Sequence, residues 1–257
     1  MRRHSVLGIF LVLGLGLGTT APALADASLA TKLEAQRIGF IESGTYQAGE
    51  DVTFTLANWN GKYLLRFNGD PEVYVLYPSS TVMGGRILKY DTSRTAISVS
   101  GWGGITVYTD KHPSGLPAVR ADAHDPVFPA IQPTTFRELR NAAEDESAHL
   151  AYAHTVRITF LADWARLAQR PKAWAQVFQA IENAGRGIEQ FTADAKGRDI
   201  VSRKLQAVRL QDGMRPAIAI SGKTLLVTFD ANKTYAGRPS SRAIQRALGH
   251  MLGQEKP

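Results

Sequence analysis

The feature that most constrains the fold is residues 44–110, where short apolar runs recur with a period of two. Six such runs follow one another between turn residues, at 52–56, 62–67, 73–77, 86–90, 95–99 and 105–109. The spacing leaves no room for helices between the runs. It therefore predicts an antiparallel β-rich N-terminal half, either a meander or a small barrel.

Glycine-rich turns separate these predicted strands. Asn68-Gly69 is a strong hairpin signal. The run Gly101-Trp102-Gly103-Gly104 precedes a strand rather than a helix, so it is a hairpin connection and not a dinucleotide-binding loop. Trp102 either packs onto the sheet or forms an exposed aromatic platform for a sugar or a peptide, which makes it a candidate binding residue.

The second half of the chain has a different pattern. A proline-rich segment, 111–133, is interpreted as an extended connector pinned by Val127, Phe128 and Ile131. Apolar residues at helical spacing between Ala153 and Leu167, and again between Trp174 and Phe191, predict two long helices joined at residues 169–171 as a central αα-hairpin.

Strand patterns return at 205–210, 217–220 and 225–229, the last two joined by the turn 221–224 as a C-terminal β-hairpin. Residues 239–241 then begin a terminal helix. The predicted fold class is α+β. We divide the chain into a signal peptide at 1–25, a lead-in at 26–43, a β-rich region at 44–110, the connector at 111–133 and the part from 134 to 257, packed with the β-rich region as one unit.

The N-terminus has the pattern of a cleaved export signal. Arg2 and Arg3 precede a thirteen-residue apolar run, and residues 23–25 offer a small-x-small cleavage site after Ala25. The apolar run is shorter than the roughly 20 residues that a membrane span needs. We therefore expect a bacterial periplasmic protein with no transmembrane span after cleavage. General secretion is favoured as the export route, and the Arg2-Arg3 pair leaves the twin-arginine route open.

Composition excludes several kinds of chemistry. The chain has no cysteine, which excludes disulfides, thiol nucleophiles, thiolate metal sites and a lipoprotein anchor. After cleavage, 28 basic residues face 23 acidic ones, a formal charge of +5. This mild excess suits attraction to anionic polymers or lipids, and no nucleic-acid partner is expected.

Familiar catalytic motifs are missing from the sequence. Ser221-Gly222-Lys223-Thr224 lacks the upstream glycine and the following helix of a phosphate-binding loop. Neither Gly-x-Ser-x-Gly nor Ser-x-x-Lys occurs in the mature chain. Acidic residues near strand ends could still pair for hydrolysis, but no spacing selects among them: Glu50, Asp51, Asp70, Glu72 and Asp110.

Two clusters combine carboxylates with histidine. The trio Glu144-Asp145-Glu146 suits the N-terminus of a helix, and His149 and His154 lie about 140° apart on a helical wheel. In the connector, the segment 122–125 carries Asp122, His124 and Asp125 and is interpreted as solvated loop. The sequence therefore predicts no metal site and no cofactor.

Basic residues recur every four positions near the C-terminus. Arg238, Arg242, Arg246 and His250 form a stripe opposite the apolar side of the terminal helix. Such a stripe is most often a solvated face, and it is also the candidate surface for anionic lipid, a polyanion or an acidic partner.

Four stretches resemble an uncharacterised family of exported bacterial proteins, a domain of unknown function. They are GKYLLRFNGDPEVYVLYP, GGRILKYD, SGWGGITVYTD and AYAHTVRITFLADWARLAQRPKAWAQVFQAIENAGRG. The resemblance covers about residues 43–250. It implies export and carries no catalytic residues.

Three functions remain open from the sequence. The first is a non-catalytic protein of the cell envelope that binds an envelope polymer or a periplasmic protein through Trp102 or through Arg238, Arg242 and Arg246. The second is a hydrolase of an envelope polymer that uses carboxylate and histidine residues. The third is peripheral association with anionic lipid through the basic terminal helix.

Overall fold

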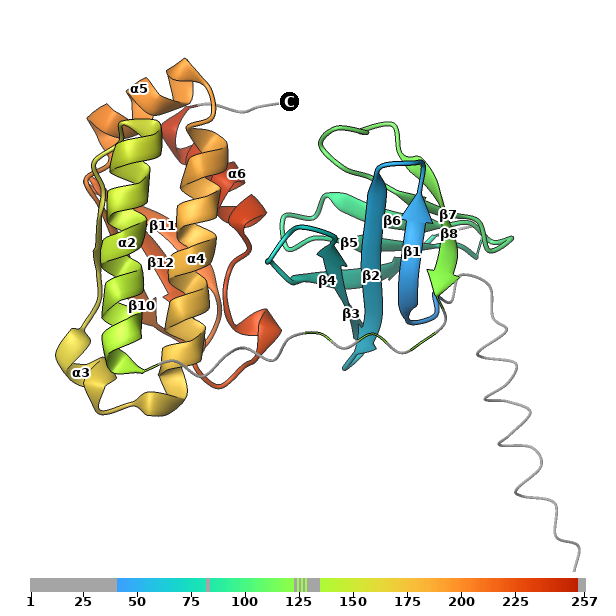
Figure 1. The fold of residues 1–257 in the computed structure, drawn as a ribbon, viewed down its shortest axis with the longest axis horizontal. Coiled ribbons are helices and arrows are strands. Elements are labelled where there is room, and N and C mark those ends of the chain that lie inside the picture. The colour runs from blue at the N-terminus through green and yellow to red at the C-terminus, as the bar shows by residue number, and fades with distance from the viewer. Residues whose placement is uncertain are drawn as a thin grey trace, which may run out of the picture. The chain divides into compact units, whose positions relative to one another are not determined.

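A computed structural model describes residues 41–81, 84–122, 124, 126, 128 and 135–253 (Figure 1). The predicted signal peptide, most of the lead-in, and Val127 and Ile131 of the connector lie outside these residues. The description below concerns the β-rich part and the helical part that follows it.

The N-terminal half is a closed barrel of eight antiparallel strands, each paired with its neighbour in the chain. They are β1 (Gly44–Ala48), β2 (Val52–Trp59), β3 (Lys62–Phe67), β4 (Tyr74–Ser80), β5 (Arg86–Lys89), β6 (Thr95–Val99), β7 (Ile105–Val107) and β8 (Leu116–Asp122). The barrel closes where β8 pairs with β1, with Ala118 opposite Ala48.

Side chains from alternate positions fill the barrel interior. The alternation in β2 directs Phe54 and Leu56 inward, and both are fully buried. Tyr46 stacks on Phe54 with ring centroids 5.2 Å apart. The core is completed by buried residues from the other strands, among them Leu65, Leu76, Leu88 and Ile97. The period-two pattern therefore produces a packed core, as in other small barrels.

The α+β class and the antiparallel N-terminal half are confirmed, and the strand count differs from the sequence prediction. Two strands were missed, β1 and β8. The strand β8 lies inside the segment interpreted as an extended connector, and its Pro117 pairs opposite Thr106. Strand β4 also continues through Pro78, where the apolar pattern stops. Proline lacks a backbone donor, so its presence argues against a strand when only the sequence is considered.

The second half contains a four-stranded sheet in the order β11-β12-β10-β9. Its strands are β9 (Thr159–Leu161), β10 (Ala207–Asp212), β11 (Ala217–Ser221) and β12 (Thr224–Phe229). Strands β9, β10 and β12 are mutually parallel where they pair, and β11 and β12 form the predicted hairpin. The turn between them is confirmed, with Gly222 at a φ of +57°.

Helices pack on this sheet. They are α2 (Phe136–His154), α3 (Trp164–Ala168), η1 (Pro171–Ala173), α4 (Trp174–Phe191), α5 (Ala195–Lys204), η2 (Tyr235–Gly237) and α6 (Ser241–Leu252). Helix α2 contacts β9, α4 contacts β10 and β12, and α6 contacts β11. The two long helices, α2 and α4, lie side by side in front of the strands in Figure 1. The second hydrophobic core lies between these helices and the sheet.

Helix α4 confirms the predicted helix between Trp174 and Phe191, but the predicted helix between Ala153 and Leu167 is wrong: that stretch holds only the end of α2, strand β9 and the short helix α3. The long helix that packs beside α4 is α2, so the expected αα-hairpin is not formed. Glu146 of α2 lies against Gly185 of α4, and His154 lies against Thr192 just after α4. Because residue numbers increase in the same direction along the contact, the two helices run parallel. The chain returns between them through β9, α3 and η1. Phe160 and its neighbours were assigned to a helix because a short buried strand has no period of its own.

Helix boundaries follow local capping chemistry. Thr135 accepts a hydrogen bond from the Glu138 amide, and the Glu138 carboxylate accepts one from the Thr135 amide, a capping box that starts α2. Ser240 accepts from the Ala243 amide at 3.0 Å and starts α6, as the sequence predicts. Across the described parts of the chain, no helix combines the length and the hydropathy needed to cross a bilayer.

Candidate functional site

The β6–β7 hairpin presents Trp102 to solvent, with 99% of its surface exposed. The Ser100 amide donates to the Gly104 carbonyl at 2.9 Å, and the Gly103 amide donates to the Ser100 carbonyl at 3.0 Å. Gly103 has a φ of +84°, a conformation that favours glycine. The hairpin interpretation is therefore right at this loop, and the indole faces outward rather than into the core.

Another exposed apolar residue lies near this turn. Ile105 of β7 pairs with Ala118 of β8, so the next residue of β8, Val119, follows on the side of the hairpin turn. Val119 is 67% exposed, whereas Ala118 faces the core. The barrel thus carries two exposed apolar side chains, Trp102 and Val119, at the end where the β6–β7 turn lies.

The predicted basic stripe is not a free helix face. Arg238 precedes α6 and is 94% buried, and it donates to the Gln179 side chain at 3.1 Å. Arg246 donates to the backbone carbonyl of Thr92 in the barrel. Placing Arg238 on the helix was wrong, since the helix begins at Ser241.

Arg242 contacts the barrel most extensively. Its guanidinium forms an ion pair with Asp110, with Nη1 2.9 Å from Oδ2 and 3.0 Å from Oδ1. The same group lies over the rings of Tyr90 and Tyr74, 4.8 Å and 5.7 Å from their centroids. A guanidinium held by a carboxylate and two aromatic rings has its charge engaged within the chain.

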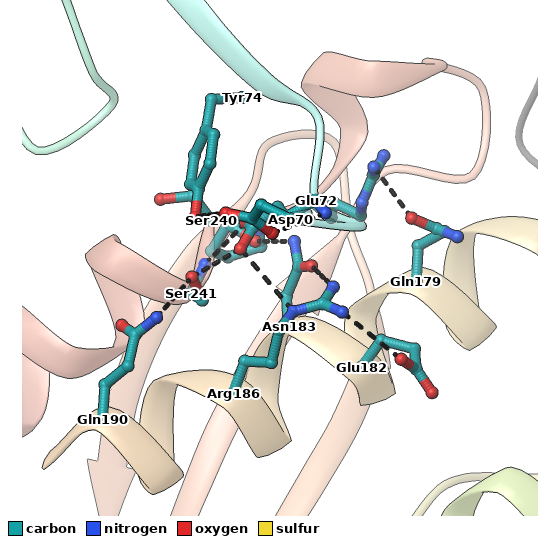
Figure 2. A network of polar contacts seen from close by, with 12 residues as sticks. Asp70, Glu72, Tyr74, Gln179, Glu182, Asn183, Arg186, Gln190, Ser240 and Ser241 are labelled. Carbon is teal, nitrogen blue, oxygen red and sulfur yellow. Dashed lines mark hydrogen bonds and ion pairs between the residues drawn. The ribbon is translucent and has the colours of Figure 1, made fainter. Parts of the chain in front are cut away.

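Two carboxylates from barrel loops bind the N-terminus of α6 (Figure 2). Glu72 accepts from the Ser241 amide at 2.9 Å and from the Ser241 hydroxyl at 2.5 Å. Asp91 accepts from the Ser240 amide at 2.8 Å and from the Ser240 hydroxyl at 2.7 Å. Helix N-termini leave amides unpaired and favour negative charge. We call these contacts, together with those of Arg242 and Arg246, the barrel–α6 junction.

Burial shapes the electrostatics of the junction. Glu72 is 1% exposed, and burial raises the pKa of its carboxyl group, an effect opposed by the hydrogen bond from Ser241 and by Arg186. Arg186 of α4 places Nε 3.7 Å from the Glu72 carboxylate (Figure 2). Burial also lowers the pKa of Arg238 to about 10. A cavity of about 20 Å³ beside these groups has room for one water molecule and no larger ligand.

The chemistry available at the junction is structural. Ser241 is fully buried, and its hydroxyl hydrogen is directed to a carboxylate rather than to a histidine. A serine nucleophile needs a base that can release the proton and an approach for a substrate. Three of the acidic residues singled out in the sequence thus have structural partners here. Glu72 accepts from Ser241, Asp110 pairs with Arg242, and Asp70 accepts from the Tyr74 hydroxyl at 3.0 Å.

The remaining sequence candidates lie at separate places. His124 Nδ1 is 2.5 Å from Asp122 Oδ1, and the His124 side chain is 93% exposed. Asp125 lies outside the described residues. Asp51 lies 3.5 Å from His112 at the surface of the barrel.

The acidic trio lies in the middle of α2, not at its start as the sequence suggested, because the helix begins eight residues before Glu144. Glu146 turns toward α4, and a groove of about 450 Å³ runs along the contact of the two helices. Its walls are formed by residues of both helices: Glu138, Asn141, Asp145, Glu146, His149 and Glu182. Burial, and next the Glu182 carboxylate, raise the pKa of Glu146 to about 7.

His149 and His154 converge, contrary to the helical-wheel prediction. Their ring centroids are 6.2 Å apart, and Glu189 of α4 lies between them. Two residues 140° apart on one helix can each lie about 70° from the line of contact with a second helix, so both imidazoles reach the same neighbour. No pattern in the sequence points to Glu189, because its partners are distant in the chain.

Comparison with known proteins adds the family. The chain matches no curated protein and no solved structure. Residues 26–248 match the family described as Domain of unknown function (DUF4908). This match spans the barrel, the sheet and nearly all of α6, as the resemblance found in the sequence implied. The chain belongs to this family of proteins with a domain of unknown function.

Proposed function

We propose that this chain is an exported protein of the bacterial cell envelope that binds an anionic, sugar-containing envelope polymer without catalysis. The proposed binding surface is the end of the barrel around Trp102, in the β6–β7 turn. The observation that carries the proposal is the 99% exposure of Trp102 on a hydrogen-bonded turn. Tryptophan is enriched among the residues that contribute most to binding.

The local structure supports a preformed contact surface. The turn is fixed by two backbone hydrogen bonds, and the Gly104 amide also donates to the Ser100 hydroxyl at 2.9 Å. A side chain on an ordered turn loses little backbone entropy on binding. Val119 extends the apolar surface beside the turn.

Charge supports the choice of an anionic polymer over a neutral one. The expected mature chain has a formal charge of +5, which attracts polyanions at low ionic strength. Arg238, Arg242 and Arg246 contribute to this charge, but their contacts lie within the chain. The proposed polymer therefore binds at the end of the barrel around Trp102 rather than at the terminal helix.

Co-sedimentation of the full mature chain with purified cell-wall sacculi tests this function. We expect sedimentation of the wild type and at least a tenfold weaker affinity for Trp102→Ala, about 1.4 kcal/mol, since truncating a central aromatic contact commonly costs this much. Met214→Ala is the matched control, because Met214 is 89% exposed in a different loop. Equal binding by Trp102→Ala and wild type would contradict the proposal.

A second arm separates lipid from polymer. Vesicles containing phosphatidylglycerol replace the sacculi, at low and at high salt. Binding to the vesicles alone, abolished by salt and unchanged in Trp102→Ala, would favour the membrane-associated alternative instead.

A further inference from the structure

Three potential metal ligands meet on the contact line between α2 and α4. The imidazole Nε2 of His154 is 3.5 Å from Glu189 Oε1, and the Nε2 of His149 is 3.9 Å from the same oxygen. One ligand atom from each of the three residues lies within 4.8 Å of the other two. We call this set the His149–His154–Glu189 cluster.

Hydrogen bonding fixes the tautomer of His154. The Thr192 hydroxyl has two backbone acceptors for its one hydrogen, the Ile188 carbonyl at 2.8 Å and the Glu189 carbonyl at 3.2 Å. Its oxygen lies 3.1 Å from His154 Nδ1, so it accepts a hydrogen bond from that nitrogen. Thr192 is fully buried, which holds this arrangement in place. Neutral His154 therefore carries its hydrogen on Nδ1 and directs the lone pair of Nε2 toward Glu189.

The three facing lone-pair atoms of the cluster are stabilised by a cation placed between them. The lone pair of His154 Nε2 and the carboxylate oxygen of Glu189 face one another, and His149 Nε2 approaches the same oxygen. Two acceptors in direct opposition repel unless a positive charge lies between them. A proton on one imidazole satisfies one nitrogen–oxygen pair, whereas a metal ion satisfies all three ligand atoms at once.

We propose that the His149–His154–Glu189 cluster binds a divalent transition-metal ion of the Zn²⁺ class. Two imidazoles and one carboxylate suit zinc and its neighbours, whereas Mg²⁺ and Ca²⁺ prefer oxygen ligands. Bonds of about 2.0–2.1 Å in tetrahedral zinc sites place donor atoms roughly 3.3 Å apart. The 3.5 Å and 3.9 Å separations between the imidazole nitrogens and the Glu189 oxygen are close to this value, and all three ligand atoms lie within 4.8 Å of one another.

Differences in burial assign a role to each ligand. The His154 side chain is 14% exposed and is held by Thr192, so it provides a fixed point of attachment. The side chains of His149 and Glu189 are 50% and 45% exposed, so they can rotate to complete the site. Thr192 is the positioning residue, because the hydrogen bond to the distal nitrogen of a ligating histidine orients the ring and raises its basicity.

Three protein ligands leave a fourth position of a tetrahedral ion open. His149 is also part of the wall of the α2–α4 groove, beside Asp145 and Glu146. The groove therefore borders the cluster at its His149 ligand. This inference is independent of the polymer-binding function, since the cluster lies on α2 and α4 and Trp102 lies in the barrel.

Zn²⁺ titration of the full chain, stripped with a chelator, tests the site. We expect one equivalent to bind in isothermal titration calorimetry at about pH 7.5, and at least a hundredfold weaker binding in His154→Ala and in Glu189→Gln. Thr192→Val keeps the side-chain shape and should weaken binding about tenfold, as is typical when an outer hydrogen-bond partner is lost. His124→Ala is the matched control, because His124 also pairs with a carboxylate.

A second measurement, by NMR, detects the metal contact at the ring nitrogens of His154 directly. Long-range proton–nitrogen NMR spectra of the histidine rings should show Zn²⁺ shifting Nε2 of His154 and leaving Nδ1 protonated. Circular dichroism of each variant checks that loss of binding does not reflect unfolding. The proposal is overturned if folded His154→Ala binds Zn²⁺ like the wild type, if His124→Ala loses binding equally, or if Zn²⁺ leaves both rings unchanged.

Discussion

At the scale of single residues, Glu146 has the most consequential environment. Its carboxyl group lies against Gly185, where any larger side chain would overlap it. Burial and the Glu182 carboxylate raise its pKa to about 7, with smaller opposing effects from His149 and Arg186. Since a carboxyl group in the unfolded chain has a pKa near 4.3, the folded protein retains a proton that the unfolded chain releases.

The free energy of unfolding should therefore fall as pH rises from about 4.5 to about 7. The stability that Glu146 contributes is fully present below the pKa that its carboxyl group has in the unfolded chain. It is lost as pH rises through the pKa of the same group in the folded protein. Partial exposure screens the charge and reduces the loss to about 1 kcal/mol. We expect Glu146→Gln to remove this loss, which urea denaturation at about pH 5 and about pH 7.5 would measure.

Glu144→Gln serves as the control for this experiment, because Glu144 lies on the same helix with a 69% exposed side chain. It should keep the wild-type difference between the two pH values. A Glu146→Gln protein with the same pH dependence as the wild type would show that Glu146 does not hold the proton.

At the scale of elements, close contact between α4 and α6 depends on Gly187. A Cβ atom at this position would lie 2.7 Å from the Ile244 Cβ and 2.7 Å from the Ser241 carbonyl oxygen. Neither atom belongs to the end of a flexible side chain, so the helices must separate to admit a methyl group. The contact also sets the place of Ser241, and through it the junction with the barrel.

Gly187→Ala should lower the free energy of unfolding by up to about 2 kcal/mol. Alanine gains about 1 kcal/mol in helix propensity, and overpacking costs about 1–3 kcal/mol. Gly185→Ala is the matched comparison in the same helix, because the three atoms nearest to its new Cβ all belong to the end of the Glu146 side chain, which can turn toward solvent. We expect the Gly185 variant to be within about 0.5 kcal/mol of the wild type. Urea denaturation showing the reverse order would contradict this account of the helix contact.

At the scale of the whole molecule, two hydrophobic cores are linked by polar contacts. One core fills the barrel and the other lies between the helices and the sheet. The barrel–α6 junction joins the two, and Glu72 is its most buried carboxylate. Removing one partner of a buried charged pair leaves the other without compensation.

Glu72→Ala should lower the free energy of unfolding by about 3 kcal/mol, because Ser241 and Arg186 lose their shared partner. Glu72→Gln should lose only about 1 kcal/mol, since an amide can still accept from the Ser241 amide and needs no buried charge. Thermal and urea denaturation would measure both. Glu50→Ala, an exposed change in a barrel turn, should stay within about 0.5 kcal/mol. A Glu72→Ala protein as stable as the Glu50→Ala protein would show that the junction contributes little to the free energy of unfolding.

Local pattern in the sequence was enough to predict most elements. The alternation at Phe54 and Leu56, the Asn68-Gly69 turn and the start of α6 near Ser240 depend on neighbours a few residues away. Closure of the barrel by β8 was not predictable from such patterns. Pro117 is typical of a connector rather than of a strand, and the partners of β8 in β1 lie about 70 residues earlier in the chain.

The α+β class, the absence of thiol chemistry and the hairpin that carries Trp102 follow from composition and short-range periodicity. Long-range packing, in contrast, directs Trp102 outward, brings Arg242 and Arg246 to the barrel, and brings His149 and His154 to Glu189. A helical wheel gives the direction of a side chain on its own helix. What the side chain meets is determined by the packing of segments distant in sequence, and that packing depends on burial of the whole chain.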